Sequence, residues 1–535
     1  MMMDYPLTLI PILERAGRLF GKVEVVSRLD ERSLHRYCYA DFYRRARALA
    51  AALQKAGLKR GDRVATLMGN HYAHLEAYFG VPVASGVLHT LNLRLHPRDL
   101  AYIVNHAQDR FLIVDDALLP LFEKFRESVS LERVIVVSLS GPKPPGAEED
   151  YESFLGSGGD EFSYPELKED EPAALCYTSG TTGRPKGVLY SHRALVLGAF
   201  ALSLVDSLAI SHHDVILPVV PLFHAAAWGV PYAATMVGAK QIFFGAHLDP
   251  ETLLELFEKE QVTFSNGVPT VWIRMLEALE SNPGRWKLAP GFRLAVAGSA
   301  APESMIRGFE RHGVRVVHGW GMTEIPPMCT LSQPKSTMRE QTDDETYALR
   351  AKQGLPGPFL DFRAMGESGE VPWDGKTMGE LQARGPWVAA AYYNLPEKQD
   401  RWTADGWFAT GDVVTIDPEG YIKIVDRTKD LINSGGEWIS SLDLENALTS
   451  HPAIQEAAVI AVPHPDWQER PLALLVSNEN SRPSPEELRE FLEQQFAHWQ
   501  VPDAFLFRDE ILRTSTGKFW KAKLREEYSK WKWKP

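Results

Sequence analysis

The chain has 535 residues and a mass of 59.9 kDa, which exceeds the size at which one hydrophobic core keeps growing, so we expect more than one domain. Hydrophobic residues make up 44% and charged residues 24%, as in ordinary folded proteins. The formal net charge of -13 and the pI near 5.7 argue against a general affinity for nucleic acid or for anionic membranes.

The first residues, "MMMDYPLTLIPILERAGRLF", lack the basic flank and the small-residue cleavage site of a secretory signal. The longest apolar stretch, residues 194–210, is interrupted by Asp206 and is shorter than the roughly 18 to 20 residues that a membrane-spanning helix needs. We therefore expect no transmembrane segment.

In chain order, apolar runs bounded by turn residues alternate with helical patterns. Residues 62–68, 86–92 and 110–116 are strand-like, and the intervening residues 71–85 and 99–107 are helical in pattern. Such alternation is typical of parallel α/β layers. The polar, Gly/Pro-rich and acidic residues 140–172 are predicted to be a loop between elements.

The pattern changes near Asp426. Beyond residues 420–440 the strands become short, and residues 441–477 followed by 484–497 give the order helix, strand, strand, helix. The sequence therefore predicts an α/β protein with a large N-terminal domain of layered α/β subdomains, residues 1–426, and a small α+β C-terminal lid, residues 427–535.

Three widely separated cysteines, Cys38, Cys176 and Cys329, include no CxxC pair. This excludes a disulfide framework, disfavours a thiolate metal site and fits a cytoplasmic location. The C-terminal run "SKWKWKP" is open to two interpretations, a disordered terminus, which is the more frequent case, and a peripheral contact with a membrane or an acyl donor.

The segment "CYTSGTTGRPKGV", residues 176–188, concentrates glycines, hydroxyl side chains and a lysine. Small residues let backbone N–H groups approach phosphate oxygens, hydroxyls add donors and lysine adds a positive charge, so the segment is suited to hold a triphosphate. It is not a Walker loop, because Gly183 is followed by Arg184, Pro185 and Lys186. A Gly/Ser/Thr-rich surface turn is the alternative.

"YTSGTTGRPKGV" resembles the phosphate-loop signature of the adenylate-forming superfamily, which contains acyl-CoA synthetases, nonribosomal-peptide adenylation domains and beetle luciferases. Further motifs follow in the order of that superfamily: "PLFHAAAW" at 221–228, "AGSAAP" at 297–302, "HGWGMTE" at 318–324, "GELQARGP" at 379–386, "WFATGD" at 407–412, "DRTKDLINSGGEWIS" at 426–440 and "RTSTGK" at 513–518. "SGGEWIS" and "PHPDWQERPLA" are most similar to the medium- and long-chain fatty acyl-CoA synthetase branch.

The resemblance implies two half-reactions. A fatty acid carboxylate attacks the α-phosphorus of ATP, pyrophosphate leaves, and the thiol of coenzyme A then displaces AMP from the acyl adenylate. Because an anion attacks a polyanion, the protein must neutralise charge and align the reactants. ATP, Mg²⁺ and coenzyme A are the implied cofactor and co-substrates, and the likeness to bacterial long-chain synthetases implies a homodimer.

The resemblance also assigns the nucleotide site. The residues implied to hold the phosphates are Thr178, Ser179, Gly180, Thr181, Thr182, Gly183 and Lys186. Glu324 is implied to bind Mg²⁺ together with the Thr178 hydroxyl, since magnesium prefers hard oxygen ligands, and Thr323 is implied to contact the α-phosphate. A helix-capping role is the alternative for Glu324.

Adenine is implied to bind beside Gly298, His318, Gly319 and Trp320. Asp412 is implied to bind the ribose diol and Arg427 the ribose or a phosphate. Taken alone, Trp320 would be a core residue and Asp412 a turn residue.

At the domain boundary the resemblance makes Lys429 the hinge about which the lid rotates between the half-reactions. Trp438 is implied to close over the nucleotide, unless it is a buried tryptophan of an ordinary loop, and Asn433 stands where many relatives have lysine. Lys518 is implied to reach the α-phosphate and the acyl carboxylate during adenylation, although a lysine this near a chain end is otherwise solvated surface.

The acyl pocket is the least specified part of the site. His224, Ala225, Trp228 and Val268 are the candidate lining residues, with Trp228 large enough to gate a tunnel. Each methylene buried in such a tunnel contributes about 0.8 kcal/mol, so chain length depends on where the tunnel ends.

Two other functions remain open. One is a ligase for aromatic or other acids, or for an acceptor other than coenzyme A. The other is a nucleotide-sensing protein that has lost catalysis, against which the presence of Lys518, Glu324 and the phosphate loop argues.

Overall fold

The computed structural model describes residues 1–533 except 30–32, 140–148, 160, 179–183, 247, 339–340, 396–399, 436, 479–481 and 515–517. The described chain divides into two compact units. The first consists of residues 1–178, 185–361 and 384–402, and the second of Arg184 and residues 362–383 and 403–533. The expected boundary at residue 426 thus falls inside the second unit.

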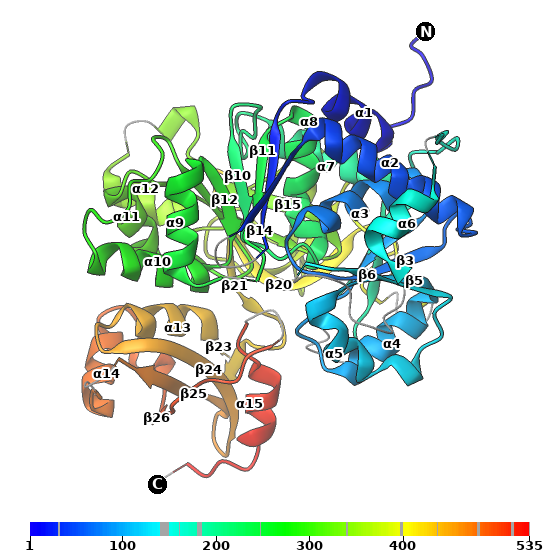
Figure 1. Cartoon of the computed structure of the whole chain (residues 1–535). Helices are drawn as coiled ribbons and strands as arrows, with labels where there is room; N and C mark the ends of the chain where they lie inside the picture. The colour runs from blue at the N-terminus through cyan, green and yellow to red at the C-terminus, as the bar shows by residue number, and fades with distance from the viewer. Residues whose placement is uncertain are drawn as a thin grey trace. The chain divides into compact units, whose positions relative to one another are not determined.

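One sheet of the first unit has seven strands in the order β7-β6-β5-β3-β4-β8-β9. Its strands β3, β5 and β6 are labelled in Figure 1. All neighbours are parallel except β8 and β9. The strands are β3 (Arg63–Leu67), β4 (Val87–Thr90), β5 (Asp109–Asp115), β6 (Arg133–Val137), β7 (Glu149–Asp150), β8 (Pro172–Tyr177) and β9 (Gly187–Ser191). The helices of this region are α2 (Tyr39–Lys55), α3 (Tyr72–Val83), α4 (Pro97–Ala107), α5 (Leu119–Glu123), α6 (Tyr151–Ser157) and α7 (His192–Ser203). The predicted alternation of strands and helices is confirmed.

The prediction that residues 140–172 form only a loop is wrong for 149–157, which fold as β7 and α6. Asp150 caps α6 by accepting the Ser153 N–H at 2.9 Å, and Tyr151, Phe154 and Leu155 bury one face of this short helix. The polar composition around the helix hid three apolar residues at helical spacing.

The second sheet of this unit has nine strands in the order β16-β15-β14-β13-β12-β10-β11-β1-β2. Its strands are β1 (Glu24–Arg28), β2 (Leu34–Cys38), β10 (Val215–Pro218), β11 (Lys240–Phe243), β12 (Phe264–Gly267), β13 (Arg293–Val296), β14 (Arg315–Met322), β15 (Ile325–Ser332) and β16 (Leu355–Pro356). Its helices are α1 (Ile10–Leu19), α8 (Val230–Val237), α9 (Pro250–Glu260), α10 (Pro269–Ser281), α11 (Glu303–Arg311) and α12 (Asp343–Arg350).

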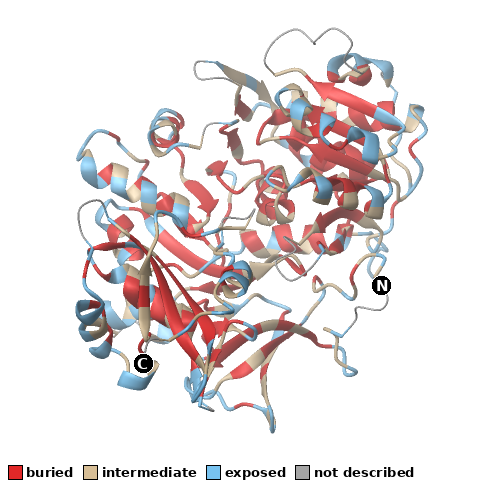
Figure 2. Ribbon diagram, turned by 90° about the horizontal axis from the view of Figure 1, so that it is seen from below, coloured by how far each residue is buried: buried red, intermediate tan, exposed pale blue. Residues whose placement is uncertain are grey.

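The central strands of this sheet are parallel to their neighbours; in spatial order they are β14, β13, β12, β10, β11 and β1. The edge strands β2, β15 and β16 each pair antiparallel. Residues on alternate faces belong to two different cores: Phe264 and Ala295 pack in the cluster that contains α8, and Leu294 and Val296 pack with α9 to α11. Because both faces are covered, most residues of these strands are buried. Buried residues are red in Figure 2.

The second unit contains two further sheets. The first has the order β18-β17-β19-β20-β21, with β17 (Asp361–Gly366), β18 (Gly369–Glu370), β19 (Gly379–Arg384), β20 (Phe408–Ile416) and β21 (Ile422–Arg427). The second contains β22 (Ile432–Ser434), β23 (Glu437–Ile439), β24 (Ile454–His464), β25 (Gln468–Ser477) and β26 (Ala504–Phe507). With α13 (Ser441–Ser450), α14 (Pro485–Glu493) and α15 (Lys521–Glu527), it forms the small α+β C-terminal domain that the sequence predicted, which is called the lid from here on.

The C-terminal segment is ordered against the lid, so the expectation of a disordered terminus is wrong for residues 529–533. Trp531 and Trp533 pack on the cluster formed by β24, β25 and α15, and the Trp533 indole N–H donates to the Pro463 carbonyl at 2.8 Å. Two large aromatic side chains provide enough apolar area to hold this short tail.

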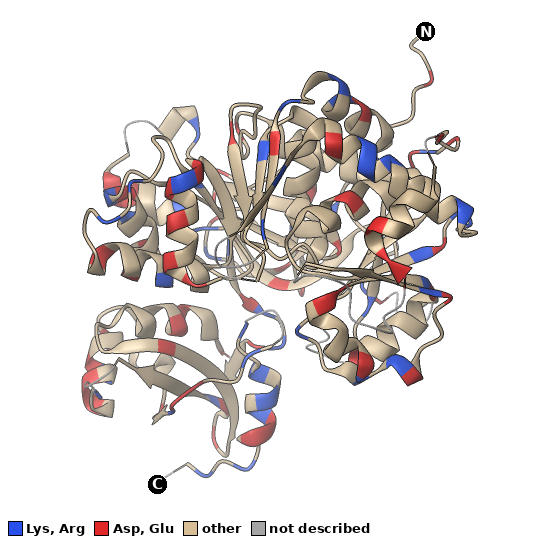
Figure 3. Ribbon diagram, in the orientation of Figure 1, with Lys and Arg blue, Asp and Glu red and all other residues tan. Residues whose placement is uncertain are grey.

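Charged residues of both signs are interspersed on the outer helices, with basic residues prominent on α15 (Figure 3). In the part of the chain that the structure describes, no helix is long and apolar enough to cross a membrane.

Candidate active site

The phosphate loop connects the antiparallel strands β8 and β9. At its base the Thr178 N–H donates to the Lys186 carbonyl at 2.9 Å, and the Lys186 N–H donates to Thr178 Oγ1 at 3.1 Å. The predicted phosphate ligands Ser179, Gly180, Thr181, Thr182 and Gly183 lie outside the described residues. The described ends therefore fix where the loop leaves and re-enters the sheet.

Lys186 and Glu324 are brought to the same aromatic ring, that of Tyr392. The Lys186 ammonium lies 4.5 Å from the Tyr392 ring centroid, and the Tyr392 hydroxyl donates to Glu324 Oε1 at 2.7 Å. Burial, followed by the Glu324 charge, raises the pKa of Tyr392, so its hydroxyl remains protonated and can donate. Tyr392 thus connects the motif "YTSGTTGRPKGV", which contains Lys186, with the motif "HGWGMTE", which contains Glu324.

The sequence motifs do not predict Tyr392 as a site residue. It lies in "AAAYYNLPE", outside the motifs, and an adjacent pair of tyrosines carries no spacing signal that separates a site residue from a core residue. The structure identifies it by the two site residues that it contacts.

Thr178 and Glu324 are the predicted magnesium ligands, and their chemistry fits that ion. The Glu324 side chain is buried, with the residue 6% exposed, and the Tyr392 bond engages one of its oxygens. Magnesium commonly takes one or two protein oxygens and completes its shell with water and substrate phosphates. Among the described residues, no group of three His, Cys, Asp or Glu side chains could hold a metal by itself.

The residue before Glu324 is fixed through its backbone. The Tyr190 hydroxyl, on β9, donates to the Thr323 carbonyl at 2.7 Å. β9 follows the phosphate loop and β14 leads into Thr323, so this bond links the loop to the predicted α-phosphate contact.

Gly298, Val268 and Trp228 converge although they are far apart in sequence. Gly298 has φ +91°, and a Cβ there would lie 3.0 Å from Val268 Cγ1 and 3.9 Å from Trp228 Cζ2. Both the backbone conformation and the space therefore favour glycine. The predicted acyl-wall residues Trp228 and Val268 thus meet the predicted adenine-slot residue Gly298.

His318, Gly319 and Trp320 lie on β14. The His318 ring donates from Nδ1 to the Ala351 carbonyl at 3.0 Å, and burial lowers its pKa to about 4, so the ring is neutral at pH 7. A Cβ on Gly319 would lie 2.7 Å from the Thr330 carbonyl, and Trp320 is buried. Here the sequence motif also serves strand packing.

The candidate acyl segment adopts an unusual backbone. Ala225, Ala226, Ala227 and Trp228 have φ values of 38°, 45°, 50° and 54°, and together form η3 (Ala225–Gly229), a left-handed turn. His224 begins it, because its carbonyl accepts the Ala227 N–H at 2.7 Å. Successive non-glycine residues with positive φ are costly, and such strain concentrates at functional sites.

Buried side chains from β3 to β4 hold the segment that enters this turn. Asn70 donates to the Pro218 and Val220 carbonyls at 3.2 and 3.0 Å and accepts the Leu222 N–H at 2.7 Å. Tyr78 and Thr90 donate to the Leu222 and Phe223 carbonyls. These positioning residues were missed, because nothing in their local sequence indicates a partner more than 130 residues away.

The other predicted residues lie in the second unit. Asp412, on β20, is only 1% exposed and pairs with Arg427 on β21 through a 2.6 Å contact between Oδ1 and Nε. Its other oxygen, Oδ2, is buried and has no hydrogen-bond partner among the described residues. A buried carboxylate oxygen with unused capacity fits a ligand hydroxyl, such as that of a ribose.

Asn433 and Trp438 face each other across the β22–β23 hairpin. The Asn433 N–H donates to Glu469 Oε2 at 3.0 Å, and Trp438 is 47% exposed, which excludes the buried-tryptophan alternative for this unit. Lys429 is exposed, beyond the end of β21. Lys518 is also exposed, and its carbonyl accepts the Thr514 N–H at 2.7 Å.

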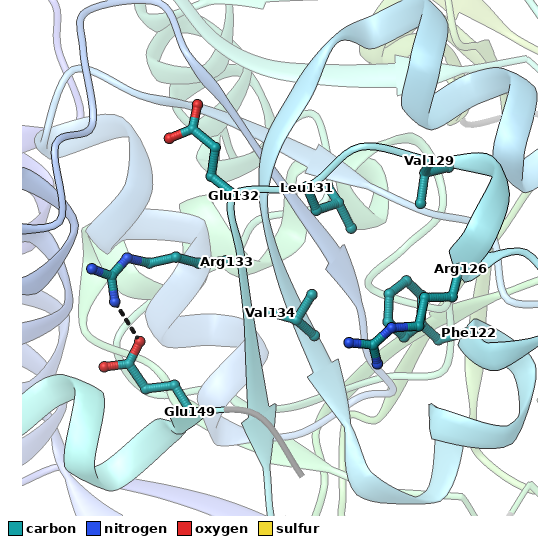
Figure 4. Close-up of a pocket in the computed structure, with 8 residues that line it drawn as sticks. All are labelled: Phe122, Arg126, Val129, Leu131, Glu132, Arg133, Val134 and Glu149. Carbon is teal, nitrogen blue, oxygen red and sulfur yellow. Dashed lines mark hydrogen bonds and ion pairs between the residues drawn. The ribbon is translucent and has the colours of Figure 1, made fainter. Parts of the chain in front are cut away.

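A surface hollow of about 360 Å³ lies in the first unit, beside β6 (Figure 4). It is lined by Phe122, Arg126, Val129, Leu131, Glu132, Arg133, Val134 and Glu149. Its charges are mixed, with Arg133 and Glu149 paired at 2.9 Å, and its lining includes no predicted site residue. We therefore do not assign it to the active site.

Two family models and several known proteins match this chain. The model of the AMP-binding enzyme family matches residues 13–393, and that of the AMP-binding enzyme C-terminal domain matches residues 443–518. The chain is 52% identical to a long-chain-fatty-acid–CoA ligase of Thermus thermophilus over 531 residues, covering 98% of this chain and 96% of the relative. It is 42% identical to a medium-chain-fatty-acid–CoA ligase of Ectopseudomonas oleovorans, covering 98% and 97%.

Among solved structures, the anthranilate CoA ligase AuaEII in complex with anthranoyl-AMP superposes with a TM-score of 0.86. The sequences are 24% identical, and the match covers 98% of each chain, so this likeness confirms the two-part α/β fold. Together, the family-model match over most of the chain and the full-length relatives show that the chain belongs to the AMP-binding enzyme family.

Proposed function

We propose that the protein is a fatty acid–CoA ligase that forms an acyl adenylate from ATP and a medium- or long-chain fatty acid and then transfers the acyl group to coenzyme A. The observation that carries the choice of acid is the 52% identity with a long-chain-fatty-acid–CoA ligase along nearly the whole chain. The contact of Lys186 and Glu324 with one tyrosine supports the adenylation chemistry.

In the first half-reaction, a carboxylate oxygen attacks the α-phosphorus, the bond from that phosphorus to the bridging oxygen breaks, and pyrophosphate departs with the electron pair. Lys186 and the loop offset the negative charge of the phosphates, and Thr323 contacts the α-phosphate. Glu324 and Thr178 would hold Mg²⁺, which supplies further neutralisation of the triphosphate when bound.

In the second half-reaction, the sulfur of coenzyme A attacks the acyl carbon. The bond from this carbon to the adenylate oxygen breaks, AMP leaves with the electron pair, and the thiol proton passes to solvent. No enzyme nucleophile is needed, so the residues of the chain act by positioning the reactants.

Asp412 and Arg427 support the ribose part of the proposal. The Arg427 contact holds Oδ1 of Asp412, which leaves Oδ2 to accept from a ribose hydroxyl. Gly298, His318, Gly319 and Trp320 would supply the adenine slot.

We further propose that residues 427–535 act as a lid that turns about Lys429 between the half-reactions. The lid would bring Lys518 to the reacting carboxylate in adenylation, and Asn433 and Trp438 to the nucleotide. The location of Lys429 beyond the last residue of β21 is consistent with a hinge.

The acyl chain would pass the left-handed turn, with His224, Ala225, Trp228 and Val268 along its path. The small alanine side chains leave volume next to Trp228. We expect Trp228→Ala to change the chain-length preference more than the KM for ATP.

A cytoplasmic, homodimeric enzyme completes the proposal. Cys38, Cys176 and Cys329 form no disulfide with one another, as in a reducing compartment, and burial raises the pKa of Cys176 to about 11. Analytical ultracentrifugation of the full chain tests the dimer.

The decisive experiment is ATP–pyrophosphate exchange over acids from acetate to palmitate and over cinnamates, with and without coenzyme A. The proposal expects exchange with medium or long fatty acids and thioester formation with coenzyme A. Exchange with aromatic acids alone, or adenylate formation without coenzyme A consumption, would favour another ligase of the family. Absence of exchange with every acid would reject the proposal.

A further inference from the structure

A group of buried charges in the second unit takes no part in the chemistry above. The Lys521 ammonium, at the start of α15, lies 2.7 Å from Glu445 Oε1 and 2.7 Å from Ser441 Oγ. The Lys521 and Glu445 side chains are only 11% and 10% exposed. Glu445 also accepts the Val459 N–H at 2.7 Å, which ties this carboxylate to β24.

The same group reaches Asp426, on β21. Asp426 Oδ2 accepts the Ser441 N–H at 2.8 Å and also the Ser441 hydroxyl. The Lys521 charge acts on this carboxylate and counters the rise in its pKa caused by burial. Ser441 therefore bridges Asp426 to Lys521.

These contacts span the proposed hinge. Asp426 precedes Lys429 by three residues, whereas Ser441, Glu445 and Lys521 follow it. A rotation about Lys429 carries one side of the group away from the other, so the contacts to Asp426 exist in one orientation only. Two further contacts cross the hinge in the same place, Lys423 with Asp443 at 3.0 Å and the Ser440 hydroxyl with the Val425 carbonyl.

We propose that Lys521 is a positioning residue: with Ser441 it latches the lid to Asp426 and thereby favours one of the two lid orientations of the reaction. This inference rests on the proposed function. Lys521 begins the helix that follows Lys518 by three residues, so the latch also fixes the segment that carries Lys518. Breaking it shifts the balance between orientations, and therefore between the half-reactions, without touching a substrate.

The neighbouring pair Arg525–Asp430 provides a matched control. Arg525 is on the same helix as Lys521 and pairs with a carboxylate, but Asp430 follows Lys429, so this pair does not span the hinge. Loss of Arg525 removes a similar ion pair from the lid and keeps the contacts that Ser441 and Lys521 make in the latch. Because the Asp430 charge also acts on Lys521 and Asp426, the control is Arg525→Met combined with Asp430→Asn, which removes both charges of the pair.

The test measures both half-reactions of the full chain: ATP–pyrophosphate exchange with decanoic acid, and thioester formation from synthetic decanoyl adenylate and coenzyme A. Lys521→Met should change the ratio of the two rates by about tenfold or more, because the lid loses the contacts that favour one of its two orientations. Asp426→Asn should change it in the same direction. Arg525→Met/Asp430→Asn should leave the ratio at the wild-type value, and Lys521→Arg, which keeps the cation, should restore it.

Lys521→Met leaves Glu445 buried beside a neutral side chain, which can destabilise the lid. The double variant Lys521→Met/Glu445→Gln removes that carboxylate charge but does not restore the latch, so it should fold and keep the altered ratio. A wild-type ratio in this folded double variant, or equal loss of both half-reactions, overturns the latch. If the wild type itself performs neither half-reaction with any acid, the proposed function fails instead.

Discussion

The two units each bury a carboxylate near a lysine, but they use these charges differently. In the first unit the Lys186 ammonium lies over the Tyr392 ring, and it is the tyrosine hydroxyl that binds Glu324. In the second unit the Lys521 ammonium contacts the Glu445 carboxylate directly.

The difference separates charges arranged for a ligand from charges arranged for the fold. A neutral hydroxyl orients Glu324 without cancelling its charge, so the carboxylate can still bind a cation. Direct pairing within the lid offsets only part of the cost of burying Glu445, because burial still raises the pKa of this carboxyl. The partners of a buried carboxylate therefore indicate its role. Where the carboxylate is held by neutral groups and has no cationic partner in the protein, a positively charged ligand is expected.

The largest effect should come from Lys518→Ala, which tests whether an exposed lysine of the second unit serves a ligand. Its cation would offset charge where carboxylate and α-phosphate meet, so we expect ATP–pyrophosphate exchange to fall by roughly 10² to 10³. Thioester formation from a synthetic acyl adenylate should stay near the wild-type rate. Equal losses in the two assays would contradict a lid that turns between the steps.

Glu324→Gln removes the charge but preserves the shape and the acceptor for Tyr392. We expect exchange to fall by roughly 10², with a larger loss at limiting magnesium, because the cation loses an anionic ligand. Titration of the exchange rate with MgCl₂ measures this. A variant with an unchanged magnesium dependence would exclude Glu324 as a ligand.

Tyr392→Phe sharpens the comparison, because it keeps the ring under Lys186 and removes only the bond to Glu324. A hydrogen bond to a charged group contributes about 1.5–3 kcal/mol, so the expected loss of exchange is roughly tenfold or more, with a raised magnesium requirement. Tyr393→Phe, at the adjacent position, is the matched control and should retain activity. Equal effects of the two substitutions would assign Tyr392 to packing alone.

Much of this architecture could be predicted from the sequence, since strand and helix periodicity locate β3 to β5 and the small C-terminal domain. The motifs predict Glu324, Asp412 and Lys518 as site residues. The predictions failed where short-range signals are weak. Helix α6 has only seven residues inside a polar segment, and Trp531 and Trp533 depend on a surface formed by β24 and β25.

Residues that act through distant partners could not be predicted. Asn70 holds the chain near residue 220, and Tyr392 joins Lys186 to Glu324 across about 70 residues or more. Their local sequences are compatible with many roles, and only the folded chain brings their partners within hydrogen-bond distance.

The smallest expected effect concerns the pH dependence of the paired charges in the lid. Burial raises the pKa of Glu445 to about 7, against the opposing influence of Lys521, while in the unfolded chain the carboxyl has an ordinary pKa near 4.5. The folded lid therefore binds more protons than the unfolded chain between these values. The contribution of Glu445 to stability is present below about pH 4.5 and is lost as the pH rises through about 7.

Glu445→Gln tests whether stability falls as the pH rises, because the amide resembles the protonated carboxyl at every pH. The free energy of unfolding of the variant, relative to that of the wild type, should rise by about 1 to 3 kcal/mol between pH 5 and pH 8. Urea denaturation of both proteins at the two pH values measures the difference, with Glu487→Gln, on the exposed start of α14, as the control. A constant difference would mean that Glu445 titrates as in the unfolded chain. A difference that falls with pH would mean that Lys521 lowers its pKa more than burial raises it, so that the lid is stabilised by the ionised pair.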